Sequence, residues 1–232
     1  MKTIGLIGGM SWTSTLEYYR LINELVAEKL GGLHSARLIL YSLDFDEIEQ
    51  AQRQARWDDA TTILSQAGIV LKQAGADLLV ICANTMHKVA DAVRERAGLP
   101  LINIIDVTGN SIIESGLGKV GLLGTRFVME EPFYRQRLEK QFDIELLVPN
   151  KNDRAVVDQI IYDELCQGKI EASSRYTLIE IIQRLIKRGA EGIILGCTEL
   201  PLLIQPSDVQ VPLFDTTLLH AEAAVNLALA EG

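Results

Sequence analysis

Four short polar segments of this sequence directly follow apolar runs, and they carry side chains that could do chemistry. They are Gly8-Gly9-Met10-Ser11-Trp12, Cys82-Ala83-Asn84-Thr85-Met86-His87, Gly124-Thr125-Arg126 and Gly196-Cys197-Thr198-Glu199. If the apolar runs are strands of parallel sheets, these segments lie at the carboxyl ends of the strands, where such sheets bind ligands. We therefore expect a small-molecule site to which all four segments contribute.

Cys197 is the strongest candidate for a reacting group. It follows an expected strand and precedes an expected helix start, where peptide dipoles favour an anion. The pKa of a thiol, ordinarily about 8.5, can fall into the range of thiolate formation at such a position. Thr198 and Glu199 place a hydroxyl and a carboxylate beside it. The alternative is a structural cysteine that packs as a small apolar residue, which is what we expect of Cys166.

The elements that must position these segments are short strands rich in Ile, Val and Leu, which alternate with helices. In the first half we expect strands over 2–8, 37–43, 77–82 and 101–105, and helices over 14–30 and 57–74, the first of them with Leu16, Tyr19, Ile22 and Leu25 on one face. In the second half we expect strands over 118–123, 144–148 and 191–196, and helices near 131–140, across 154–188 and from about 217. This alternation predicts the α/β class, with a doubly wound parallel sheet in each half.

The two halves also match each other in sequence. Residues 4–8 match 120–124, residues 74–81 match 188–195, and Pro100-Leu101 matches Pro212-Leu213. The near-constant offsets indicate two duplicated domains, although βα units share composition and can match by chance. We expect one domain over 1–105 with 214–232 and the other over 106–213, related by a pseudo-twofold axis. A tight hinge near 105–118 and a ligand cleft between the domains follow from this division.

Composition and charge argue against several classes of function. The 232 residues are 48% hydrophobic and 23% charged, which indicates a globular chain rather than a disordered one. With 22 basic and 31 acidic residues the formal charge is -9, so we expect no nucleic-acid partner. No apolar run approaches the ~20 residues that span a bilayer, and we expect no signal peptide and no membrane partner. The three cysteines indicate a reducing, cytoplasmic compartment, and the three scattered histidines give no metal site.

Three of the four segments, in this order and at this spacing, resemble the aspartate/glutamate racemase family: Gly8-Gly9-Met10-Ser11-Trp12, Asn84-Thr85-Met86-His87 and Gly196-Cys197-Thr198-Glu199. The resemblance extends along essentially the whole chain. It implies an amino-acid racemase that uses no cofactor and binds a small amino acid. Such an enzyme removes the Cα proton with one cysteine and returns a proton from a second cysteine on the opposite face. The resemblance also makes a homodimer plausible.

The sequence departs from the family at one of these two cysteines. The family's first cysteine stands directly before Asn-Thr, and here Ala83 holds that position; the internal repeat likewise matches Ala83 with Cys197. Cys82 is one residue earlier and should face the opposite way in a strand. Either an irregular strand end redirects Cys82, or a water or hydroxyl replaces the base, or proton transfer is one-sided, which we favour. A one-thiol lyase or isomerase and a non-catalytic amino-acid-binding protein are the alternative functions.

Several further residues are candidates for binding the substrate. Without a pyridoxal electron sink, hydrogen-bond donors must stabilise the enolate-like charge. Groups suited to this are the side chains of Asn84, Thr85, Thr125 and Thr198 and the N–H groups of Gly9 and Met10, although Asn and Thr also cap helices. The resemblance implies that Gln52 or Arg53 reaches the substrate from the loop after the second strand, and that the Ala83 backbone lines the site. It also implies that Lys169 binds the distal carboxylate, for which surface solvation is the alternative.

Overall fold

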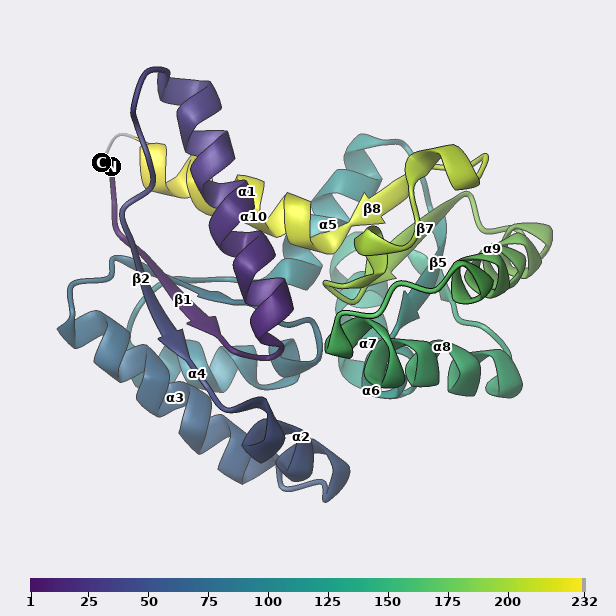
Figure 1. Cartoon of the computed structure of the whole chain (residues 1–232), viewed down its shortest axis with the longest axis horizontal. Helices are drawn as coiled ribbons and strands as arrows, with labels where there is room; N and C mark the ends of the chain where they lie inside the picture. The colour runs from purple at the N-terminus through teal and green to yellow at the C-terminus, as the bar shows by residue number, and fades with distance from the viewer. Residues whose placement is uncertain (231–232) are drawn as a thin grey trace. The chain divides into compact units, whose positions relative to one another are not determined.

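The chain folds into two α/β units. The computed structural model describes residues 1–230, in which Met1–Asn103 and the residues from His220 onward form the first unit and Ile104–Leu219 form the second (Figure 1). Each unit contains a four-stranded parallel sheet packed with helices, which confirms the predicted fold class. Among the described residues, no helix combines the length and the apolar character needed to cross a lipid bilayer.

The sheet of the first unit has the strand order β2-β1-β3-β4. Its strands are β1 (Ile4–Gly8), β2 (Leu38–Ser42), β3 (Leu78–Ile81) and β4 (Leu101–Ile102). All residues of β1 and β3 are buried, as in the central strands of parallel sheets that are covered on both faces. One face packs against α1 (Trp12–Leu30) and α10 (Thr216–Leu229), and the other against α2 (Phe45–Arg53), α3 (Trp57–Gln73) and α4 (Ala90–Ala97), as Figure 1 shows.

The second unit repeats this arrangement with the strand order β6-β5-β7-β8. Its strands are β5 (Lys119–Gly124), β6 (Glu145–Leu147), β7 (Gly192–Gly196) and β8 (Leu213–Asp215). Its helices are α5 (Ile104–Glu114), α6 (Arg126–Glu130), α7 (Pro132–Phe142), α8 (Lys151–Asp163) and α9 (Ala172–Lys187). They share one apolar cluster with the sheet, in which each fully buried Leu or Ile contributes about 1.5–3 kcal/mol of burial free energy.

The common strand order confirms the duplication that the internal repeat predicts. The two central strands of each sheet pair in the same register, Ile7 with Ile81 and Leu123 with Leu195. Ala83 and Cys197 each stand two residues beyond the second member of these pairs. The strand register therefore makes Ala83 the counterpart of Cys197, independently of the sequence motifs.

The strand expected near the junction of the halves is shorter than predicted. It was expected over 101–105 and ends at Ile102, and the helix α5 occupies most of the segment 105–118, for which a tight hinge is the prediction. Ile104, Thr108 and Ile112 are buried along one side of α5, at the spacing of four residues that suits a helix face. A short apolar run fits a buried strand or a buried helix equally well, and here the helical period decides.

The buried face of α1 also differs from the expected one. Ile22 is buried, but Leu16 is 56% and Tyr19 is 52% exposed. The core instead receives Tyr18 and Val26, which lie four residues on either side of Ile22. The helix ends at Leu30 as predicted and begins two residues earlier, at Trp12. Its core-facing stripe lies along a different set of positions because large apolar residues occur on both of its sides.

Tyr18, His220 and Ile102 form a buried polar chain in the first unit. His220 Nδ1 lies 2.8 Å from the Tyr18 hydroxyl, and His220 Nε2 lies 2.9 Å from the Ile102 carbonyl oxygen. Because a carbonyl only accepts, Nε2 carries the hydrogen and the Tyr18 hydroxyl donates to Nδ1. Burial and the neighbouring His87 ring lower the pKa of His220 to about 3.

This buried neutral histidine predicts a pH-dependent stability. An unfolded histidine takes up a proton near pH 6.5, whereas the folded one does so only near pH 3. The free energy of unfolding should therefore fall by up to about 1.4 kcal/mol per pH unit as the pH is lowered between these values. Urea unfolding of the parent and of His220→Gln across this range measures the effect, and the variant should lose this part of the slope. Equal slopes would mean that His220 takes up its proton in the folded protein.

Candidate active site

The carboxyl edge of the second sheet brings together the two polar segments predicted for that unit. β5 and β7 are hydrogen-bonded neighbours whose last paired residues are Gly124 and Gly196. A Cβ added to Gly124 would stand 2.8 Å from the Gly196 carbonyl oxygen, so the backbones approach at a distance that excludes a side chain. Thr125 and Cys197 follow these glycines directly and leave the sheet from adjacent strands.

Cys197 has a carboxylate partner in its own loop. Its Sγ lies 3.0 Å from Oε2 of Glu199, and the Thr198 hydroxyl donates to the same oxygen at 2.7 Å. All three residues are buried, with Glu199 only 2% exposed. A buried carboxylate needs hydrogen-bond donors to offset its lost hydration, and the thiol and the hydroxyl supply two. Cys197 is thus in contact with a group that can accept its proton.

The expected lowering of the Cys197 pKa is wrong. Burial raises the pKa of this thiol well above its ordinary value, and the negative charge of Glu199 raises it further. The segment that follows is not a full helix but the three-residue 3₁₀ helix η3 (Leu200–Leu202), which offers few aligned peptide dipoles. Resting Cys197 is therefore a protonated thiol.

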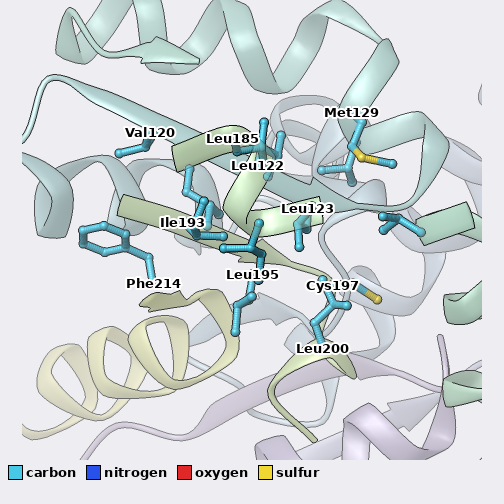
Figure 2. Close-up of a cluster of buried hydrophobic side chains, with 14 of the residues drawn as sticks. Val120, Leu122, Leu123, Met129, Leu185, Ile193, Leu195, Cys197, Leu200 and Phe214 are labelled. Carbon is cyan, nitrogen blue, oxygen red and sulfur yellow. The ribbon is translucent and has the colours of Figure 1, made fainter. Parts of the chain in front are cut away.

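Cys197 lies at the margin of the large apolar cluster of the second unit. Its side chain is 7% exposed and packs with this cluster. Figure 2 shows its sulfur directed away from Leu195 and Leu200. The apolar neighbours keep bulk water from the thiol, and the low local dielectric strengthens its interaction with Glu199.

Cys166 contacts the same carboxylate, although it was expected to be a core residue. It is half-buried in the 3₁₀ helix η2 (Leu165–Gln167), and part of its side chain packs against the apolar cluster. Its Sγ lies 3.8 Å from Oε1 of Glu199. This contact joins residues 33 positions apart, and no local sequence pattern signals it.

Thr125 and Lys169, the other candidates of the second unit, have contacts of their own. The Thr125 hydroxyl caps α6 by accepting from the Val128 N–H at 3.4 Å. Lys169 is exposed, and its Nζ donates to Oε1 of Gln167 at 2.8 Å. An ammonium carries three donors, so this contact leaves Lys169 able to bind a carboxylate as well.

In the first unit, Cys82 and Ala83 face opposite sides of the sheet, as predicted. Cys82 is fully buried in the apolar cluster that contains Tyr18, whereas Ala83 belongs to the cluster that contains Met10 and Met86. Burial raises the pKa of the Cys82 thiol far above its ordinary value. Redirection of Cys82, one of the explanations for the missing base, is therefore wrong.

The loop after β1 is built around Gly9. This residue has a φ of +87°, and an added Cβ would stand 2.2 Å from the Leu43 carbonyl oxygen, so only glycine fits. The Gly9 N–H donates to the Thr15 hydroxyl at 2.8 Å, and the expectation that this N–H is open to a substrate is wrong. The Met10 side chain is buried in the apolar cluster of α2 and α3.

Gln52 is the candidate of the first unit whose own contacts point to a ligand. The segment expected to be a loop is the helix α2, which begins after the capping residue Asp44, and Gln52 faces inward from it with 3% exposure. Its Nε2 donates to the sulfur of Met86 at 3.0 Å, and its Oε1 has no hydrogen-bond partner in residues 1–230. An unsatisfied buried acceptor costs about 1–3 kcal/mol unless a ligand supplies a donor. Arg53, by contrast, lies exposed and pairs with Glu49.

The contact with Met86 places Gln52 at the carboxyl edge of the first sheet. Met86 lies in the 3₁₀ helix η1 (Thr85–Val89), which directly follows Asn84 beyond the end of β3. Asn84 and Thr85 are 4% and 7% exposed. The Asn84 carbonyl accepts from the His87 N–H at 3.0 Å, which closes the turn. Gln52, Asn84 and Thr85 are thus brought together at one edge of one sheet.

Neither edge contains a recognisable metal or dinucleotide site. Within residues 1–230, no three His, Cys, Asp or Glu side chains are arranged to hold a metal ion. The glycines after β1 do not have the G-x-G-x-x-G spacing of a dinucleotide-binding loop. The chemistry that these residues offer is proton transfer and hydrogen bonding.

Known proteins share both the sequence pattern and the architecture of this chain. The family model for Asp/Glu/Hydantoin racemase matches residues 7–224. The crystal structure of a candidate Asp/Glu racemase from Yersinia pestis has a TM-score of 0.92 at 53% identity, covering 99% of this chain and 100% of that one. The structure of an aspartate racemase homologue from Pyrococcus horikoshii OT3 has a TM-score of 0.86 at 37% identity, with the same coverage. A broad-specificity amino-acid racemase of Bacillus subtilis (strain 168) is 20% identical over 98% of each chain.

Proposed function

Because the chain belongs to the Asp/Glu/Hydantoin racemase family, we propose that it removes and returns the Cα proton of aspartate or glutamate without pyridoxal phosphate. Cys197 is the acid and base on one face of Cα, and Ala83 occupies the position of the opposite base. The observation that supports this best is the 3.0 Å contact between the Cys197 thiol and the buried carboxylate of Glu199. It combines a nucleophilic atom with a proton acceptor at the edge where parallel sheets bind ligands.

The proposed proton path starts at the thiol. Oε2 of Glu199 takes the proton of Cys197, and the thiolate then removes the Cα proton and becomes a thiol again. The electron pair left on Cα is delocalised into the substrate carboxylate. Return of the proton from Cys197 restores the amino acid, and the thiolate regains its proton from Glu199. A thiol whose pKa is raised forms a strong base once it is deprotonated, which suits a weakly acidic Cα–H.

The side chains proposed to bind the substrate are neutral donors and acceptors at the carboxyl edge of each sheet, together with one ammonium. The buried Oε1 of Gln52 suits the amino group of the substrate, because it is an acceptor that the described residues leave without a donor. Asn84, Thr85, Thr125 and Thr198 suit the α-carboxylate, where the enolate charge forms. Met10 and the Ala83 backbone line the site, and Lys169 binds the distal carboxylate.

The alanine at position 83 favours a second candidate, a lyase or isomerase that works with one thiol. A carbanion that is protonated only by Cys197 needs no base on its other face. For an amino acid, the same asymmetry means that the proton is returned mostly to the face from which it came. A protein that binds amino acids without turning them over is the third candidate, because it retains the binding residues only.

Incubation with L-aspartate or L-glutamate in deuterium oxide separates these functions. Proton NMR measures the loss of the Cα–H signal, and chiral chromatography measures the D-enantiomer. Exchange with inversion supports a racemase, and exchange with retention supports the one-base enzyme. Release of carbon dioxide from aminomalonate, with no exchange of either amino acid, identifies a lyase. Binding detected by calorimetry without exchange identifies the non-catalytic protein and overturns the proposal.

Lys169→Met is expected to raise KM for aspartate and glutamate by about tenfold, the effect of losing one charge-assisted hydrogen bond. The exchange rate of alanine, which has no distal carboxylate, should not change. Lys187→Met is a matched control, because Lys187 is also an exposed lysine of the second unit but lies at the end of α9. Equal KM values for parent and Lys169→Met would show that Lys169 is only a solvated surface residue.

A further inference from the structure

Both carboxylate oxygens of Glu199 accept a hydrogen bond from a thiol. Oε2 accepts from Cys197 at 3.0 Å and from the Thr198 hydroxyl at 2.7 Å. Oε1 accepts from the Cys166 thiol at 3.8 Å. The first two donors come from the loop after β7, and the third comes from η2, between α8 and α9. Two separate segments of the second unit therefore fix the orientation of one buried carboxylate.

Cys166 is a protonated donor under ordinary conditions. The charged groups that face it are Glu199 in the loop after β7 and Asp158 on α8, and both are acidic. Together with burial they raise the pKa of the Cys166 thiol far above its ordinary value. An S–H group therefore stays on Oε1 across the neutral range, and it can offset part of the cost of burying the charge of Glu199.

We propose that Cys166 is a positioning residue for the reaction of Cys197. Its S–H group holds Oε1 of Glu199 and so directs Oε2 to the Cys197 thiol. When Cys197 and Glu199 lose their shared proton, they carry one more negative charge, and without the Cys166 donor this charge is less well stabilised. The pair therefore keeps the shared proton to a higher pH. Cys166 does not touch the substrate in this scheme, and its effect reaches the reaction only through Glu199.

The position of Cys166 also connects two parts of the proposed site. Lys169 lies three residues further along the same segment, and its backbone N–H donates to the Glu164 carbonyl at 3.0 Å. The turn that carries Lys169 therefore also carries Cys166, whose thiol contacts Glu199. The inference rests on the proposed function of Cys197, but it can be tested without any substrate.

Comparing Cys166→Val with Cys166→Ser separates the effect of the hydrogen-bond donor from the effect of side-chain volume. Valine keeps an apolar group of similar size and removes the donor, whereas serine keeps a donor. We expect Cys166→Val to lower kcat for Cα exchange by about tenfold with KM unchanged, the effect of losing one hydrogen bond to a charged group. The pH at which Cys197 is half-alkylated by iodoacetamide, followed by peptide mass spectrometry, should rise by about half a unit or more. Cys166→Ser should remain closer to the parent in both measurements.

Each outcome decides the inference. If Cys166→Val has the parent's pH profile and the parent's alkylation midpoint, Cys166 is a packing residue and the inference is wrong. If serine and valine act alike, the effect comes from packing and the inference is again wrong. If valine prevents folding, as thermal melting would show, Cys166→Ala gives the same comparison without added bulk. If the parent exchanges no amino acid, the proposed function fails, but the alkylation midpoint still decides whether Cys166 acts on Cys197 through Glu199.

Discussion

Cys197→Ala is expected to abolish Cα hydrogen exchange on aspartate and glutamate, with a rate at least about 10²–10⁴-fold below that of the parent. The substitution removes the sulfur that contacts Oε2 of Glu199, and with it the base that is proposed to meet Cα. Proton NMR in deuterium oxide measures the rate directly, and calorimetry shows whether the substrate still binds.

The pH dependence of the parent tests the same assignment. Burial and the charge of Glu199 raise the pKa of Cys197, and in the proposed reaction Glu199 takes the thiol proton within the site, so the pair has to hold that one proton. We therefore expect kcat/KM for exchange to be constant through the neutral range and to fall where the pair loses its proton at alkaline pH. Cys82→Ala is the control, since Cys82 is fully buried in a different apolar cluster and its loss should leave exchange unchanged. Exchange by Cys197→Ala at the parent's rate would assign the base to another residue.

The architecture could be predicted from the sequence because parallel strands that are buried on both faces are continuous apolar runs. The runs that form β1, β3, β5 and β7 are of this kind. β1, β5 and β7 end on a glycine, and β3 is followed by Cys82, Ala83 and the polar Asn84. Alternation along β3 was also enough to separate Cys82 from Ala83. Features that depend on local sequence could therefore be predicted, namely the strand ends, the loop that carries Cys197 and the position of Ala83 as its counterpart.

The environment of Cys197 could not be predicted in the same way. A position after a strand and before a helix start lowers a thiol pKa only if the dipole outweighs burial and neighbouring charge. Here Glu199 is two residues away and equally buried, so its charge acts in the opposite direction. The contact between Cys166 and Glu199 arises from the packing of η2 against the sheet edge, which no pattern along the chain encodes.

In the first unit, too, the candidate residues could be predicted from the local sequence, but their contacts could not. Gln52 was a candidate, but its helix was missed because the polar residues around it resemble a loop, even though Asp44 is a favourable capping residue. Only the structure shows that its amide faces Met86 and that Arg53 lies exposed. The Gly9 N–H was also a reasonable candidate, and only the fold of α1 reveals that Thr15 already occupies it.

Ala83→Cys is expected to raise racemisation, measured as formation of D-aspartate or D-glutamate, by about 10²-fold or more. The register of the two sheets makes position 83 the counterpart of Cys197, so the substitution restores the second thiol that the family pattern contains. In the proposed reaction this thiol protonates Cα on the face that Cys197 cannot reach. Exchange with retention should then give way to exchange with inversion in both directions.

A thiol at position 83 would differ from Cys197 in its nearest charged neighbour, and this difference affects how its reaction depends on pH. Two residues beyond Cys197 stands Glu199, whereas two residues beyond Ala83 stands Thr85, which carries no charge. A cysteine at 83 therefore lacks a neighbouring carboxylate in its own loop to take its proton. We expect the gain in racemisation to increase with pH more steeply than exchange in the parent, because this thiol has to ionise into solvent.

Ala83→Ser and the double variant Ala83→Cys/Cys197→Ala complete the test of position 83. Serine has nearly the same size as cysteine but is a much weaker acid, so it should leave racemisation close to the parent's rate. Of the two counterpart positions, the double variant has a thiol only at 83. It should exchange the enantiomer opposite to the one that the parent exchanges, and it should do so faster than Cys197→Ala does. If Ala83→Cys folds as the parent does and neither variant gains exchange or inversion, position 83 does not face Cα. In that case the two sheets share a strand order and register, but position 83 has no role in proton transfer that corresponds to that of Cys197.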